Sequence, residues 1–558
     1  MRNWGAKSSM RSRLLVLAVA ALSATLSFPL DRAHFIELEK KGREQAKQQN
    51  WKGLRETLVA MGKEMPVPTP VYMLRMASVE THLGNRAEAI RWMERYAATG
   101  LKYDPARDDD LKPLASDPAF ASVALEMKER TQAAQKALAV CALPLPDLMP
   151  EDLTFDRIAG TFVVSSIQHH TLYRVTLPKA GGAECTLREI ALEDQVRRWP
   201  ALALSADATR NLLWMTASAM PGFTGFPKED QGKTALFALD GASGKIVRRF
   251  DLASGGPGVL GDMSVADDGT VYVSDSIGGG VYRVQGDLKT AVLEKIAGDF
   301  FSPQTPVMAA DGKRLFVADY SMGVGVVDLT GPNPPGQLDY LAHPEAVAVT
   351  GLDGLYLSGD SLFGIQNGTQ PARIMRYQLN PAQTEITSGE VVEQATERMG
   401  EATHVIGLNG WLYITANVGW NRIDDHGRLK AGERSSASAS PRLRRGARSA
   451  CAQRADLWLS ASRDLPMTST SSRPSKSVTL PVRLPHFPPL SFGSATRASG
   501  MRSSTAHRRT VLLGMSIPGF RNCTGTRGRH HNRNRTTTSR CKYGAWLHIS
   551  RLWNSGNM

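Results

Sequence analysis

Polar side chains stand just before a series of short apolar runs in the middle of the chain. They are Glu151 in PEDLTFD, Trp199 in RWPALALS, Asp262 in LGDMSVADDG, Gln304 in SPQTPVMAADG, Asp353 in TGLDGLYLSGD, and Glu401 and His404 in GEATHVIGLNG. Carboxylate and amide oxygens suit a hard divalent cation such as calcium, and like charges held in a narrow space repel until a cation neutralises them. Brought to one point, these residues predict a metal site. The alternative is that they line a wet channel or bond to strand-end amides.

A second set of short runs, each following one of these after a turn, forms an internal repeat. They are FVVSSI (162–167), LWMTAS (213–218), VYVSDS (271–276), LFVADY (315–320), LFGIQN (362–367) and LYITAN (412–417). Most follow a Gly/Asp turn and an earlier short strand, and most precede a third strand. A single unit of this kind cannot bury both faces, so the repeat predicts a mainly β fold, a six-bladed β-propeller over 140–433. In that fold the innermost strands run along a central channel, and the polar residues before them converge at one mouth.

Residues 145–430 resemble the senescence marker protein and gluconolactonase family of lactonase and esterase propellers. The resemblance is carried by PEDLTFD at the first blade and LDGLY at a later one. It implies one divalent metal, most simply calcium with zinc as the alternative, held by Glu151, Asp353 and, where the family has Asn, Gln304. It also implies hydrolysis of a lactone or ester, with Asp353 or Asp262 as general base.

For substrate contacts we expect Asp262, together with Trp199, Glu401 and His404 around the channel mouth. The family's Asn beside Asp262 is replaced by Gly261, which removes one expected sugar contact. The rival function is a non-catalytic propeller and repeat module that binds a peptide, sugar or protein partner. No G-x-S-x-G elbow occurs in the blades, which disfavours serine-hydrolase chemistry.

Other polar and aromatic side chains in the blades have structural interpretations. The pair His169 and His170 is predicted at the rim, with a catalytic role as the alternative. Asn367 and Asn417 are predicted turn formers. The aromatic side chains either wedge between blades or wall a pocket; they are Trp199, Phe223 and Trp420.

The N-terminus indicates export. Basic residues precede an apolar run of roughly 13 residues and then small residues, which predicts a signal peptide over 1–27 and a periplasmic or secreted protein. An uncleaved anchor is the alternative, but a span needs about 20 apolar residues, and no second run of that length follows. Cys141 and Cys185 either pair or stay free.

Residues 33–137 predict a helical domain. YMLRMASVETHLGNRAEAIRWMERYAATG has 3.6-residue apolar spacing and resembles a tetratricopeptide repeat, with two helices joined at Gly84-Asn85. Such repeats provide a groove for a protein partner, or a cap that packs against the next domain. With one clear repeat, the sequence favours the cap.

Residues 434–558 break these patterns. They hold 20 Arg, 2 Lys, 2 Asp and no Glu, a net charge of +20, whereas the rest of the chain carries −6. No nucleic acid is therefore expected on the folded body. The tail is predicted to be disordered, either a segment that binds nucleic acid or an anionic surface or, as the abrupt change favours, out-of-frame or read-through translation. We then expect a sixth blade that is incomplete or held by the strand in CALPLPDLM.

Overall fold

A computed structural model describes residues 30–104, 107–178, 184–253, 256–333, 337–396 and 399–430, and two strands at 455–461 and 511–515. The strands of these residues form six sheets, which confirms the prediction of a mainly β fold. The predicted signal peptide lies outside the described residues. Within the described part of the chain, no helix is both long and apolar enough to cross a membrane.

The first three sheets each contain four antiparallel strands in chain order. Sheet 1 has β3 (Leu153–Asp156), β4 (Thr161–Ser166), β5 (Thr171–Thr176) and β6 (Thr186–Glu189). Sheet 2 has β7 (Ala201–Asp207), β8 (Leu212–Ser218), β9 (Thr234–Asp240) and β10 (Ile246–Asp251). Sheet 3 has β11 (Leu260–Val265), β12 (Val271–Asp275), β13 (Val281–Val284) and β14 (Glu294–Ala297).

Of the last three sheets, sheets 4 and 6 include strands from distant parts of the chain. Sheet 4 has β15 (Pro303–Met308), β16 (Arg314–Asp319), β17 (Gly323–Asp328), β18 (Gln337–Tyr340) and, at its edge, β1 (Leu30–Asp31). Sheet 5 has β19 (Leu352–Ser358), β20 (Ser361–Gln366), β21 (Arg373–Leu379) and β22 (Ile386–Gln394). Sheet 6 has β23 (Val405–Leu408), β24 (Trp411–Ala416), β26 (Val511–Met515), β25 (Ala455–Ala461) and β2 (Ala137–Leu143).

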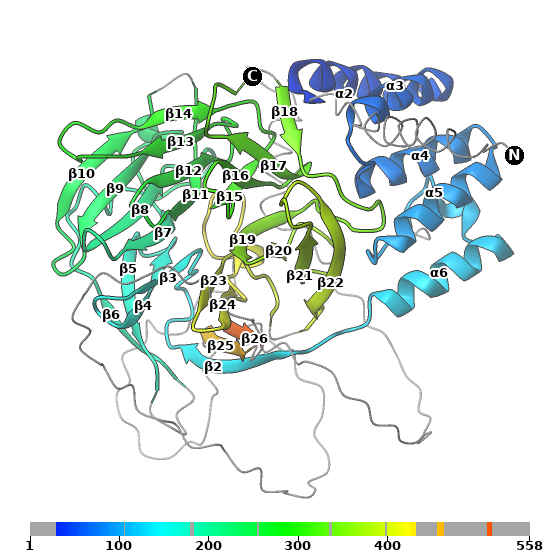
Figure 1. Ribbon diagram of the computed structural model, residues 1–558. Helices are drawn as coiled ribbons and strands as arrows, with labels where there is room; N and C mark the ends of the chain where they lie inside the picture. Colours follow the sequence, from blue (N-terminus) through cyan, green and yellow to red (C-terminus); the bar gives the residue numbers. More distant parts are fainter. Residues whose placement is uncertain are drawn as a thin grey trace, which may run out of the picture.

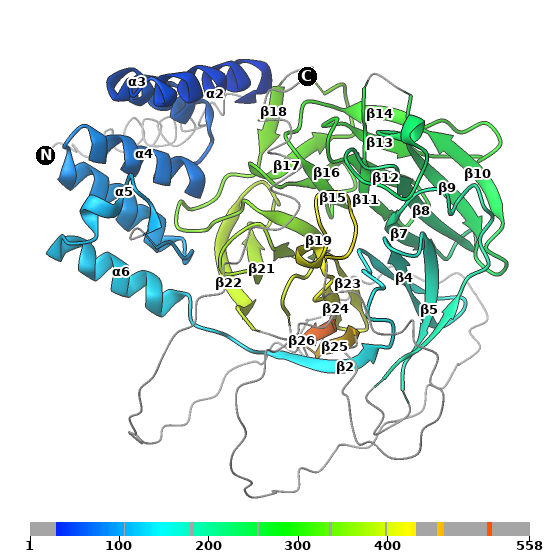
Figure 2. The same ribbon diagram turned by 180° about the vertical axis from the view of Figure 1, so that it is seen from behind.

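The six sheets stand in a closed ring, the arrangement of a β-propeller (Figures 1 and 2). The first strand of each sheet lies beside the first strand of the next, from β3 through β7, β11, β15 and β19 to β23, and β23 lies beside β3 again. Each of the six runs identified in the sequence is the second strand of its sheet. Apolar clusters fill the interfaces between neighbouring sheets, because one sheet cannot bury both faces alone.

Four of the innermost strands begin with an irregular register. The pairing shifts between Ala201 and Leu204 in β7, Leu260 and Asp262 in β11, Pro303 and Pro306 in β15, and Leu352 and Leu355 in β19. A bulge adds a residue to one strand and changes which side chain faces which side. The bulges therefore decide which residues of these segments point into the channel.

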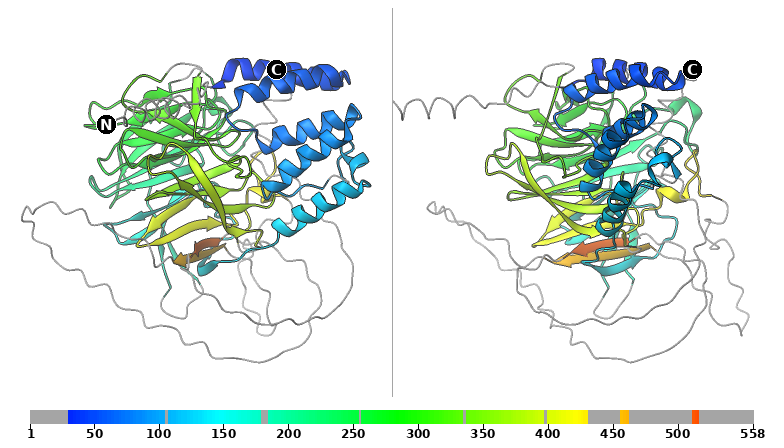
Figure 3. Two further views of the ribbon diagram at one scale, coloured as in Figure 1. Left: turned by 45° about the vertical axis from the view of Figure 1, so that its right-hand side comes forward. Right: turned by 90° about the vertical axis from the view of Figure 1, so that its right-hand side faces the viewer.

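The N-terminal domain consists of helices packed side by side, α2 (Arg32–Lys47), α3 (Trp51–Glu64), α4 (Pro70–His82), α5 (Arg86–Ala98) and α6 (Pro118–Arg130). Side chains cap four of the helix starts: Asp31 accepts from His34 N, Asn50 from Gly53 N, Thr69 from Tyr72 N, and Asp117 from Ala119 N. The turn between α4 and α5 is at Gly84, whose positive φ of 75° favours glycine. These helices stand along one side of the ring (Figure 3).

The helical domain packs against sheets 4 and 5. Phe35 of α2 contacts Phe301 edge to face, with ring centroids 5.5 Å apart. Arg95 of α5 binds Glu345 through two bonds of 2.5 and 2.6 Å. The buried Arg373 donates to the carbonyl oxygens of Thr99 (3.1 Å) and Gly100 (3.3 Å), where α5 ends. One apolar cluster includes both helical residues and residues of sheets 3 and 4.

Sheet 6 differs from the expectation of a tail without structure. Two tail segments, β25 and β26, are strands that pair with β2 and β24. The two strands, ADLWLSA and VLLGM, lie between β24 and β2 and pair with the edges of both. An unpaired strand edge is a template for further pairing. The rest of 434–558 lies outside the described residues. β2 shares Cys141–Leu143 with the segment that we expected to hold the sixth sheet, but it pairs with β25 and β26 and not directly with β24. Cys141 in β2 forms a disulfide with Cys185.

Candidate metal centre at one end of the ring

Four predicted residues meet at the end of the ring where the innermost strands begin. Glu151 precedes β3 of sheet 1, and Asp262, Asp353 and His404 belong to sheets 3, 5 and 6. All four are buried, with 4 to 7 % of their surface exposed. A fifth residue, Asp152, is 2 % exposed and joins them. Asp152 was not predicted from the sequence, although it stands next to Glu151.

One half of the centre is built around His404 and is called the histidine half. Nε2 of His404 lies 3.2 Å from Oδ1 of Asp152, and Nδ1 lies 3.6 Å from Oδ1 of Asp262. Burial lowers the pKa of His404, but the two carboxylates outweigh it and raise that pKa to about 9. Burial, partly offset by His404, raises the pKa of Asp152 to about 8. His404 thus carries its proton at neutral pH and itself neutralises one of these carboxylates.

The other half, called the carboxylate half, contains Glu151 and Asp353, with Glu401 close enough to act on both. Burial, then the charge of Asp353, raises the pKa of Glu151 well above its usual range. Burial and the charge of Asp262 do the same for Asp353. Each of these two carboxyl groups accepts a hydrogen bond from a neutral side chain. The Trp420 indole donates to Glu151 Oε2 at 2.5 Å, and Asn367 Nδ2 donates to Asp353 Oδ2 at 2.7 Å.

The donor set fits a divalent cation. Asp152, Asp262 and His404 offer ligand atoms that all lie within 4.8 Å of one another. The buried acceptor Asn367 Oδ1 receives no hydrogen bond, and buried acceptors normally find a donor or a cation. Five carboxyl groups interact here, those of Glu151, Asp152, Asp262, Asp353 and Glu401, and their ionised forms repel one another. A cation relieves that repulsion.

Two other predicted residues have different surroundings. Gln304 is buried, and its amide nitrogen donates to Ser302 Oγ at 3.1 Å. Its neighbour Thr305 is the residue of β15 that reaches the centre, because its hydroxyl donates to Asp262 Oδ2 and to Asp353 O. Trp199 lies away from the carboxylates and donates to Asp230 at 3.1 Å. It lines a separate cavity of about 1140 Å³ at sheet 2.

The remaining residues have specific partners. The Asn367 amide contacts Asp353 (2.7 Å) and Ala402 O (2.8 Å), so it does more than form a turn. His169 contacts Tyr173 Oη at 2.8 Å and Asp147 at 3.3 Å, outside the centre. At Gly261 a Cβ atom would lie 2.1 Å from Ser276 Oγ. No larger side chain fits there unless Ser276 moves.

A group of buried apolar side chains covers the same end of the ring and is called the apolar cap. Sheets 1, 2, 3 and 6 contribute to it, and its members include Met149, Ile167, Leu202, Phe223, Val259 and Trp420. Trp420 joins the cap to the centre, since its indole N–H binds Glu151 and its ring lies 6.2 Å from that of Phe223. The turn residues 224–225 and 425–426, which follow the cap residues Phe223 and Ile423 in the chain, are exposed.

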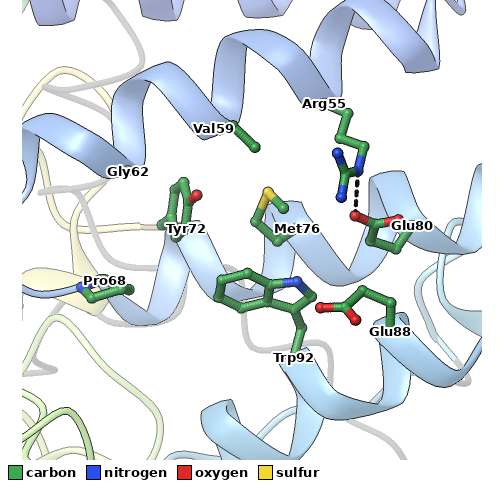
Figure 4. A pocket seen from close by; sticks show the side chains of 9 residues that line it. All are labelled: Arg55, Val59, Gly62, Pro68, Tyr72, Met76, Glu80, Glu88 and Trp92. Atoms are coloured by element: carbon green, nitrogen blue, oxygen red, sulfur yellow. Dashed lines mark hydrogen bonds and ion pairs between the residues drawn. The ribbon is translucent and has the colours of Figure 1, made fainter. Parts of the chain in front are cut away.

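The helical domain contains a further cavity of about 310 Å³ between α3, α4 and α5 (Figure 4). Tyr72, Met76 and Trp92 form its apolar side, and Arg55 Nε binds Glu80 at 2.6 Å on the other. Arg95 stacks over the Trp92 ring, 3.8 Å from its centroid. The charged groups here are paired with each other, which is typical of a packed helical domain and indicates no chemistry.

Comparisons with known proteins find likenesses of fold only. No family model matches the chain, and no curated protein matches it. Among solved structures, a luciferin-regenerating enzyme is 15% identical, covering 53% of this chain and 91% of its own, with a TM-score of 0.36. A gluconolactonase from Xanthomonas campestris is 13% identical (51% and 96% covered, TM-score 0.32). The calcium-binding protein regucalcin from Agrobacterium tumefaciens is 19% identical (51% and 85%, TM-score 0.35). At these values the likenesses carry no argument about ligand or reaction.

Proposed function

We propose that this chain is an exported, metal-dependent hydrolase of a lactone or ester, of the gluconolactonase type, with its site in a six-bladed propeller. The observation that carries the proposal is the buried cluster of Glu151, Asp152, Asp262, Asp353 and His404 at one end of the ring. Burying so much like charge costs stability, so such clusters are typical of functional sites. The helical domain in front is proposed to be a tetratricopeptide-like cap.

We place the cation in the carboxylate half. In the histidine half the His404 imidazolium lies between Asp152 and Asp262, whereas no ion pair joins Glu151 or Asp353 to a basic side chain of the described residues. Their oxygens, with the unpaired Oδ1 of Asn367 nearby, form an oxygen-rich set that suits calcium better than zinc. Gln304 remains the predicted third ligand in the fourth sheet, provided that its amide turns from Ser302.

A bound cation would polarise the carbonyl of the substrate and lower the pKa of an attacking water. Asp262 is held by Met263 N (2.7 Å) and by the Thr305 hydroxyl, and is our general base. It accepts the proton of the water as the water oxygen bonds to the carbonyl carbon. When the ring C–O bond breaks, His404 gives its proton to the leaving alkoxide and is reprotonated through Asp262. Lactone and water thus become a hydroxy acid. Asp353 is the alternative base.

The test joins turnover to metal binding. The purified protein is assayed on lactones and aryl esters with calcium, with zinc and with EDTA, and its melting temperature is recorded in each. We expect metal to raise both activity and melting temperature, and Asp353→Asn to abolish both gains. His404→Gln should lose activity but keep the gain in melting temperature. The reverse result would move the cation to the histidine half. No turnover with metal present would favour a binding module.

A further inference from the structure

We infer that the substrate carries an apolar substituent, an alkyl or aryl group on the lactone or ester, and that the apolar cap receives it. The inference rests on the proposed function, because it takes the carboxylate centre as the place where the reacting carbonyl binds. Trp420 makes the two regions continuous, with Glu151 on one side and Phe223 on the other. Whatever reaches the carboxylates from that end must therefore replace contacts of the cap.

The composition of the cap selects against a polyhydroxy sugar. Phe223 and Trp420 are 6 % and 1 % exposed, and their neighbours Met149, Leu202 and Val259 are as deeply buried. The N–H of Trp420 is already used on Glu151. A hydroxyl group placed among these side chains would lose its hydrogen bonds to water and gain none, whereas an alkyl or aryl group would lose nothing.

The cap is built from two turns that hold each other by a few exposed bonds. Thr224 N donates to His426 O at 3.0 Å, and His426 Nδ1 contacts Gly222 O at 3.1 Å. Phe223 stands between two glycines with positive φ, Gly222 at 84° and Gly225 at 102°, which is backbone that glycine adopts without strain. Separating the turns would expose the Phe223 ring to water. An apolar substituent restores that lost burial, and a polyol does not.

The experiment uses a series of γ-lactones whose alkyl chain grows from none to eight carbons, with glucono-δ-lactone as the polar comparison. Binding to the metal-free protein is followed by tryptophan fluorescence, which needs no turnover, and kcat/KM is measured with metal. We expect affinity and kcat/KM to rise roughly two- to fourfold for each added methylene. Phe223→Leu should flatten this dependence. Phe250→Leu, a matched control at the interface of sheets 2 and 3, should leave it unchanged.

The results of this experiment distinguish failure of the apolar site from failure of the proposed hydrolase activity. Turnover of glucono-δ-lactone without chain-length dependence overturns the inference and leaves the hydrolase standing. Binding that grows with chain length, without turnover of any lactone, keeps the apolar site and overturns the hydrolase. Equal slopes in the Phe223→Leu and Phe250→Leu proteins would place the alkyl chain away from the cap and refute the inference.

Discussion

The raised pKa values in the carboxylate half lead to a measurable proton release on metal binding. Burial and mutual repulsion keep Glu151 and Asp353 protonated to higher pH than usual. A cation binds their ionised forms, so binding displaces at least one proton. For each proton released, the dissociation constant falls about tenfold for each unit that the pH rises. We therefore expect metal affinity to rise with pH over the range in which these carboxyls ionise, by up to about tenfold per pH unit for each proton released.

The same shifts set the stability of the metal-free protein. A carboxyl whose folded pKa is raised above its unfolded value stabilises the fold at low pH, and that contribution is lost as the pH rises through the folded pKa. The melting temperature without metal should therefore fall as the pH is raised from about 5, and saturating metal should reverse that trend.

The assay is isothermal titration calorimetry at several pH values, in pairs of buffers with different heats of ionisation, which counts the protons directly. Asp353→Asn removes one titrating group, so the number of protons released should drop by about one while affinity falls. Asp207→Asn is the matched control, since Asp207 is buried at the other end of β7 and pairs with Arg210 at 2.6 Å. A dissociation constant that is the same at pH 6 and pH 8 would refute the placement of the cation on Glu151 and Asp353.

Three further predictions follow from single contacts. Cys141→Ser removes a disulfide that closes 44 residues and should lower the free energy of unfolding by about 3–4 kcal/mol in urea denaturation; an unchanged midpoint would contradict this. Trp420→Phe removes the donor to Glu151, which raises the pKa of that carboxyl, and should weaken metal binding roughly tenfold at pH 7 by calorimetry; equal affinity would count against it. A double-mutant cycle of Arg95→Ala and Glu345→Ala should give a coupling energy of only about 0.5–1 kcal/mol, because both side chains are about one-third exposed; a value near 3 kcal/mol would show stronger coupling between the domains.

Much of the β region could be predicted because its second strands repeat. FVVSSI, LFVADY and the other runs combine β-branched or aromatic residues with small residues at a fixed end, and each proves to be the second strand of a sheet. Such strands are buried on both faces, so their composition shows in the sequence without any alignment. The acidic residues near the start of β11 and β19 could be predicted for the same reason, since these strands precede recognisable runs.

The finer geometry of the site could not be predicted because of the bulges. In β15 the register shifts between Pro303 and Pro306, and Thr305 reaches the carboxylates where Gln304 was predicted from the family resemblance. Asp152 was missed because its neighbour Glu151 satisfied the same pattern. Asn367 follows a strand and precedes glycine, which is also what a turn requires. Only its contact with Asp353 distinguishes the two roles.

The way the helical domain is inserted determines how it can move. Its chain enters from β1 at the outer edge of sheet 4 and leaves into β2 at the outer edge of sheet 6. The helical domain is therefore joined to the ring at both of its ends, through β1 in sheet 4 and β2 in sheet 6. It cannot rotate about a single connection. A protease that cut one of its connections would leave it attached by the other. Helices and ring should accordingly lose their structure in one transition on heating, and not as two separable bodies.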